Sequence, residues 1–145
     1  MDTWAKVIDQ HCERLTDDHT SPDAVDNIRM AVDLAHRATV AIQDLDGWGE
    51  RPGVRDAALH LNMARAELRG ASSRRGAFAD AIPPPLAAEG AEDVAARLVT
   101  LLATVYRALV DALEPGGPLA GGLSSARAAI EVDEARRALC ARSLA

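Results

Sequence analysis

Residues 21–45 read SPDAVDNIRMAVDLAHRATVAIQDL, and this stretch decides the class of fold to expect. Ser21 is placed to cap a helix, Pro22 suits its first position, and Asp23 favours the positive end of the helix dipole. From there to Leu45, apolar residues recur in steps of three and four, which is the spacing of a helix face. They form two adjacent stripes: Val25, Ile28, Val32, Ala35, Thr39 and Ile42, and then Met30, Leu34, Ala38, Ala41 and Leu45. The stretch therefore predicts a long helix that touches several neighbours.

The same spacing predicts four more helices, and no stretch shows the alternation of a β-strand. Their expected ranges are 3–16, 53–70, 91–113 and 124–143, beside 22–45 for the first. The helices at 22–45 and 91–113 match in length and in apolar breadth, so we place them at the centre. The expected fold is all-α: an antiparallel four-helix-bundle-like domain with an additional N-terminal helix, about five helices in all.

The chain of 145 residues is expected to form one helical domain, because this length can fold on a hydrophobic core alone. Glycine and proline mark three connections, of which the longest, residues 70–90, holds Gly76 and Pro83-Pro84-Pro85. Its composition disfavours a continuous helix, and we expect this connection to be mobile. No internal repeat is visible in the residue letters.

Composition narrows the expected location and partners. The formal net charge of −6 argues against nucleic-acid binding, and the longest apolar stretch, residues 98–106, is too short to span a membrane. The first residues lack a secretory signal pattern, and Cys12 and Cys140 are expected to stay reduced. These features favour a cytoplasmic protein. Lys6 is the only lysine, and alanine is abundant, which is typical of a GC-rich, actinobacterial genome.

The sequence contains no recognisable set of catalytic or metal-binding residues. Carboxylate metal sites in helical bundles use Glu-x-x-His motifs, and none is present. The nearest pattern, Asp33-x-x-His36, falls on the polar side of its helix and is expected to point outward. Asp56 and His60 lie four apart on the helix expected at 53–70, and both histidines, His36 and His60, are expected to be solvated. No nucleophile elbow, phosphate-binding glycine loop or Cys-x-x-Cys occurs either. We therefore expect no metal, no cofactor and no enzymatic activity.

Charge distribution gives the clearest indication of a functional surface. Residues 51–76 hold six arginines against only Asp56 and Glu67, in a chain that is acidic as a whole. Four of these arginines follow one another closely: Arg65, Arg69, Arg74 and Arg75. One interpretation is that they pair with acidic neighbouring helices, and each exposed pair then contributes about 0–1 kcal/mol. The other is a surface that binds an acidic partner.

Three aromatic residues are further candidates. Trp48 stands between Gly47 and Gly49, where it either plugs the end of the bundle or is exposed as an interaction anchor.

The preferred function is a non-catalytic protein-interaction or regulatory module that binds another protein or its own copy as a homodimer. The alternative is a ligand-binding bundle or small enzyme with a pocket between helices, lined by His11 or Tyr106.

Overall fold

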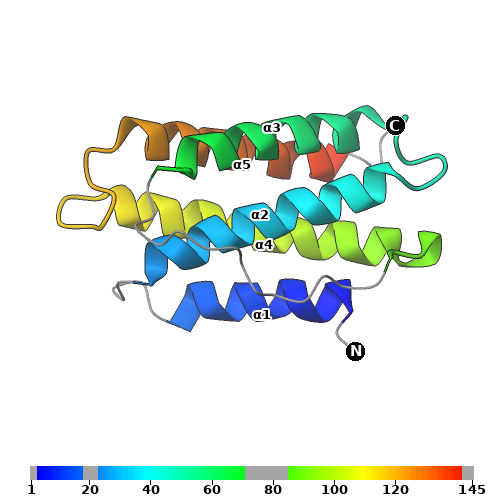
Figure 1. The fold of residues 1–145 in the computed structure, drawn as a ribbon, viewed down its shortest axis with the longest axis horizontal. Coiled ribbons are helices and arrows are strands. Elements are labelled where there is room, and N and C mark those ends of the chain that lie inside the picture. Colours follow the sequence, from blue (N-terminus) through cyan, green and yellow to red (C-terminus); the bar gives the residue numbers. More distant parts are fainter. Residues whose placement is uncertain (1–2, 18–22, 71–84, 142–145) are drawn as a thin grey trace.

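The structure is a computed structural model that describes residues 3–17, 23–70 and 85–141, and these residues form an all-helical bundle (Figure 1). The helices are α1 (Trp4–Asp17), α2 (Ala24–Gln43), α3 (Pro52–Leu68), α4 (Ala91–Leu113) and α5 (Leu123–Cys140), and a short 3₁₀ helix, η1 (Ala88–Gly90), precedes α4. The predicted fold class is confirmed, and every helix end lies within about one turn of its expected position. Ser21 and Pro22, the expected start of α2, lie outside the described residues.

Four helices form the bundle in the spatial order α2, α3, α5, α4, and α1 packs against α2 and α4. Each of α2 and α4 contacts three helices, so both are central, as their broad apolar surfaces predict. The colours of Figure 1 show that each bundle helix runs antiparallel to its two neighbours in this order. α3 and α4 are diagonal and run in the same direction, so α3 ends and α4 begins at opposite ends of the bundle. The connection that the sequence predicts to be mobile, residues 70–90, consists mainly of residues 71–84, which lie outside the described residues.

The core consists of aliphatic side chains from all four bundle helices, and the outer pair adds many alanines. The largest fully buried side chains of α2 and α4 are Ile28, Val32, Ile42, Leu98, Leu101, Leu102 and Leu109. α3 and α5 bury Leu61, Leu68 and Leu139 together with small side chains, among them Ala57, Ala64, Ala128 and Ala135. Small side chains allow two helices to approach closely, which explains why α3 and α5 form the most extensive helix pair.

The hairpins α2–α3 and α4–α5 share one pattern of burial. The buried residues of α3 are Val54, Ala57, Ala58, Leu61, Ala64 and Leu68, and those of α5 are Ser125, Ala128, Ala129, Val132, Ala135 and Leu139, each 71 positions later. In α2 and α4 the corresponding shift is 70, as from Ile28 to Leu98 or from Ile42 to Ala112. The two halves of the bundle are therefore built alike. Four of the six equivalent buried positions of α3 and α5 carry the same residue, whereas most of those of α2 and α4 differ.

A tight turn joins α2 to α3 and sets how the two helices face each other. Gly49 lies so close to the end of α2 that a Cβ atom there would be 2.6 Å from the carbonyl oxygen of Gln43. The indole of Trp48 is buried beneath the turn, and the guanidinium of Arg51 lies 3.8 Å from its ring centroid. Pro52 then begins α3 at the position where a missing N–H costs no hydrogen bond.

Candidate functional site

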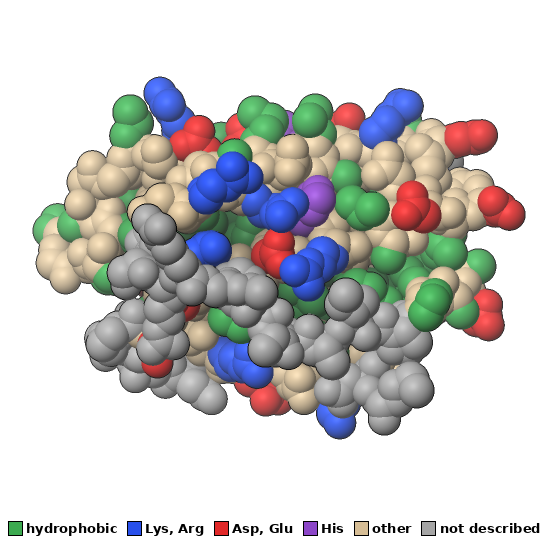
Figure 2. Space-filling view, in the orientation of Figure 1, with side chains coloured by type: hydrophobic (Ala, Val, Ile, Leu, Met, Phe, Trp, Pro, Cys, Tyr) green, Lys and Arg blue, Asp and Glu red, His purple; other side chains and the backbone are tan. Residues whose placement is uncertain are grey.

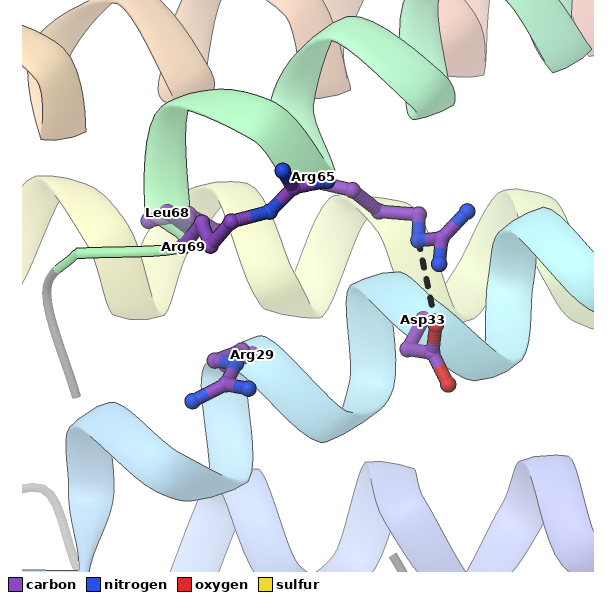
Figure 3. Close-up of a pocket in the computed structure, with 5 residues that line it drawn as sticks. All are labelled: Arg29, Asp33, Arg65, Leu68 and Arg69. Atoms are coloured by element: carbon purple, nitrogen blue, oxygen red, sulfur yellow. Dashed lines mark ion pairs between the residues drawn. The ribbon is translucent and has the colours of Figure 1, made fainter. Parts of the chain in front are cut away.

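Arginine side chains gather on one face of the bundle, over α2 and α3 (Figure 2). A small pocket of about 80 Å³ opens there, lined by Arg29 and Asp33 of α2 and by Arg65, Leu68 and Arg69 of α3 (Figure 3). The helices are antiparallel, so the first half of α2 meets the last turns of α3. A pocket of this size holds roughly two or three water molecules, which is the volume of a single small polar group. We call these five residues the arginine pocket.

Asp33 is the acidic centre of the arginine pocket. Its side chain is only 14% exposed and forms ion pairs with two guanidinium groups. The Oδ2 atom lies 2.9 Å from Nη2 of Arg37, one turn along α2, and Oδ1 lies 3.0 Å from Nε of Arg65 on α3. Charge-assisted bonds of this kind hold their partners in place more firmly than neutral ones do. Asp33 thus fixes the position of Arg65 at the rim of the pocket.

His36 completes the support of Arg65 from the other side. Nη1 of Arg65 lies 3.0 Å from Nδ1 of His36. A guanidinium can only donate, so Nδ1 accepts, and the ring carries its proton on Nε2. Burial lowers the pKa of His36 below its ordinary value, and the positive charge of Arg65 lowers it further, while Asp33 acts in the opposite direction. A neutral imidazole is therefore part of the geometry of the site.

Arg69 adds a positive charge to the pocket that its carboxylate does not balance. The carboxylate of Asp33 is already shared by Arg37 and Arg65. Arg69 is exposed and makes no ion pair within residues 3–17, 23–70 and 85–141. The guanidinium presents a planar fork of donors that matches a carboxylate or phosphate group. The arrangement can therefore bind an anionic group at the mouth of the pocket.

The structure brings together two of the four arginines that the sequence singles out. Arg65 and Arg69 line one pocket. Arg65 also pairs with Asp33 of α2, in line with the interpretation that these arginines pair with acidic neighbouring helices. Arg74 and Arg75 lie outside the described residues.

The outward placement predicted for Asp33 and His36 is wrong, because α3 covers that side of α2 and both side chains contact Arg65. The contact of Asp33 with Arg65 could have been inferred from the sequence, because the two residues are opposite charges on the polar sides of two consecutive helices. His60, also expected to be solvated, is half-buried and hydrogen-bonded to Glu131.

The aromatic candidates lie elsewhere. Trp48 is only 7% exposed, so its ring plugs the end of the bundle and is not an exposed anchor. His11 is buried in α1, whereas Tyr106 is 38% exposed on α4. One is thus an interior residue, and the other is partly exposed at the surface.

Two further features bear on binding and chemistry. An open apolar hollow of about 380 Å³ lies where α1 meets the start of α4, with Trp4, Leu86 and Val94 in its wall. The two cysteines are free: Cys140 is exposed, whereas Cys12 is half-buried. Burial raises the pKa of the Cys12 thiol, and the nearby carboxylate of Asp9 raises it further.

Among the described residues, no group of three His, Cys, Asp or Glu side chains is arranged to hold a metal ion. No described helix combines the length and apolar character needed to cross a bilayer. No protein-family model matches the chain, and neither does any curated protein. No solved structure matches its fold.

Proposed function

We propose that the protein is a non-catalytic binding module whose arginine pocket receives a carboxylate from an acidic partner protein. The observation that carries this proposal is the guanidinium of Arg69, which lines a pocket whose carboxylate, Asp33, is already shared by Arg37 and Arg65. Asp33 and His36 hold Arg65 in place, so part of the ordering cost of binding is met before the partner arrives. Arg69 supplies the guanidinium with which the bound carboxylate would form an ion pair.

The size of the pocket supports a side chain as the bound group. About 80 Å³ accommodates one carboxylate and excludes most whole metabolites, which need pockets of several hundred Å³. The chain carries a net charge of −6, so long-range repulsion disfavours a polyanion such as nucleic acid. A local acidic protein surface satisfies both conditions.

The test is binding of a fluorescent glutamate-rich peptide, with its glutamine counterpart as the uncharged control. We expect the glutamate peptide to bind and its affinity to fall with added salt. Arg69→Gln should weaken binding about threefold to tenfold, since one charged contact is lost without disturbing any ion pair of the described fold. Arg107→Gln, an exposed arginine on α4, is the matched control and should leave binding unchanged.

Equal affinity for the two peptides, or equal loss in both arginine variants, would reject the arginine pocket as the binding site. Acetate and phosphate are added as competitors. Full competition by either at low millimolar concentration would assign the site to small anions in place of a partner protein.

A second candidate function, binding of an apolar small molecule, is favoured by the hollow beside Trp4 and Leu86. Its volume of about 380 Å³ falls within the range of ordinary ligand pockets. A dye that fluoresces in apolar surroundings should bind there and be lost on Leu86→Glu. Unchanged dye binding in this variant would remove the candidate.

A further inference from the structure

The outer face of the bundle, formed by α3 and α5, carries large apolar side chains that are exposed to solvent. Leu59 is 59% exposed, Met63 43% and Ile130 61%. Figure 2 shows hydrophobic side chains along this rim, between charged ones. Leu59 and Met63 are four residues apart on α3, so they form one outward ridge. We call this surface the α3–α5 face, and it is distinct from the arginine pocket.

Charged residues flank the apolar positions symmetrically on both helices. On α3, Arg55 and Glu67 lie equally far on either side of position 61, the midpoint between Leu59 and Met63. On α5, Arg127 and Glu134 lie equally far on either side of the point between residues 130 and 131. Within the described ranges none of these four charges forms an ion pair. Each helix thus presents a basic and an acidic group around an apolar centre.

The fold places the two midpoints side by side. Nδ1 of His60 on α3 lies 2.6 Å from Oε2 of Glu131 on α5, so these residues stand at the same level of the antiparallel pair. A single two-fold axis, perpendicular to the helices and lying in the plane of the face, can therefore cross both midpoints. The polar pair at this centre is already hydrogen-bonded, so covering it leaves neither group without a partner.

We propose that the α3–α5 face is a homodimer interface, in which a second copy of the chain packs around this two-fold axis. The axis pairs each helix with its own copy in antiparallel orientation. Leu59 of one copy then lies opposite Met63 of the other, and the Ile130 side chains of the two copies lie near each other. The axis also sets Arg127 level with Glu134 of the other copy, in both directions at once, because a two-fold interface repeats each contact. Arg55 and Glu67 are related in the same way.

The other two-fold arrangement fits the charges badly. An axis parallel to the helices would lay α3 over α5 of the second copy at unchanged levels. Arg55 would then stand level with Arg136 of that copy, while Asp56 would lie between the levels of Glu134 and Arg136. Like charges facing each other oppose association, so the perpendicular axis is the one that the sequence of the two helices fits.

The available area indicates a weak dimer. α3 is about 25 Å long at 1.5 Å per residue, and two helices side by side cover a width of about 20 Å. The face then buries about 500 Å² on each copy, or about 1,000 Å² in total, which is near the lower limit for a specific interface. We expect a dimer that forms at micromolar concentrations or above and dissociates on dilution.

The experiment is analytical ultracentrifugation of the full chain from about 5 µM to about 1 mM, and the average mass should rise toward twice that of the monomer. Ile130→Glu should raise the dissociation constant at least about tenfold, because it puts a second carboxylate beside Glu131 at the centre of the face. Val110→Glu replaces an exposed valine on α4 and should leave the dimer intact. Circular dichroism checks that both variants keep the fold.

Charge exchange tests the axis itself. Arg127→Glu and Glu134→Arg should each weaken the dimer, because like charges then face each other across the axis. The double variant Arg127→Glu/Glu134→Arg should restore it. A wild type that stays monomeric to 1 mM overturns the proposal, and so does a dimer disrupted by Val110→Glu but not by Ile130→Glu. Failure of the double variant to recover would overturn the perpendicular axis.

Discussion

Asp33 shows how one residue can organise a basic site. Its carboxylate is shared between Arg37 on its own helix and Arg65 on the next, and so it holds two like charges near each other. Arg69 adds a further guanidinium to the pocket that this carboxylate does not pair with. Asp33 therefore contributes to stability and opposes anion binding. One substitution should change the two properties in opposite directions.

Asp33→Asn should lower the free energy of unfolding by about 1–2 kcal/mol, since two charge-assisted bonds to a mostly buried carboxylate are weakened and partly exposed guanidiniums recover some hydration. The same variant should bind the acidic peptide more tightly, because a negative charge leaves the pocket while the Asn oxygen and His36 can still accept hydrogen bonds from Arg65. Urea denaturation and peptide titration measure the two effects. Asp56→Asn, at an exposed position on α3, is the control and should change neither. Weaker peptide binding by the Asp33 variant would contradict this account.

His36 gives the fold a dependence on pH. Its pKa is lowered in the folded state, so the unfolded chain binds protons more readily at this site. The contribution of neutral His36 is fully present above its ordinary pKa of 6.5 and is lost as the pH falls below that value. His36→Asn keeps an acceptor for Arg65 but cannot titrate. Urea denaturation at several pH values between about 7.5 and 5 should show a smaller loss of stability in the variant, and parallel losses would show that His36 is not responsible.

At the scale of the element, the turn from α2 to α3 depends on the close approach of Gly49 to the carbonyl of Gln43. Gly49→Ala would place a Cβ atom within van der Waals overlap, so the turn must open and α3 must shift against α2. We expect a loss of about 1–3 kcal/mol, of the size usual for overpacking. Gly70→Ala, where no heavy atom lies within 4 Å of the added methyl group, should change stability little. Thermal unfolding of both variants checks the prediction, and equal stability of the two would contradict it.

The helices could be predicted from the sequence because apolar periodicity reports which face of each helix is buried. The bounds expected for the fourth bundle helix, residues 91–113, are those of α4. Periodicity does not report which helix covers a polar side chain, so Asp33 and His36 were expected in solvent although α3 covers them. For the same reason Trp48 remained undecided, because both alternatives leave it in the same loop. Arg65 and Arg69 were found by their charge, whereas Arg29 is part of the pocket only through the packing of α2 on α3.

At the scale of the molecule, α2 and α4 connect every part of the bundle through a shared core. The whole chain should therefore unfold in one transition. Leu102→Ala removes a fully buried side chain from α4 and should cost about 2–5 kcal/mol, whereas Val110→Ala, at an exposed position on the same helix, should cost much less. Circular dichroism, which follows all helices, and tryptophan fluorescence, which follows Trp4 and Trp48, should give coincident melting curves in both variants. Separate transitions would show that the hairpins unfold independently.

The unequal surroundings of the two cysteines make the native chain ready for site-specific labelling. The Cys12 thiol is half-buried and its pKa is raised, so little thiolate is present at neutral pH, whereas Cys140 is exposed at the end of α5. A maleimide fluorophore at pH 7 should therefore attach to Cys140 well before Cys12, which peptide mass mapping can follow. Without any engineered cysteine, donor- and acceptor-labelled molecules can then be mixed, and energy transfer between them reports when two chains meet.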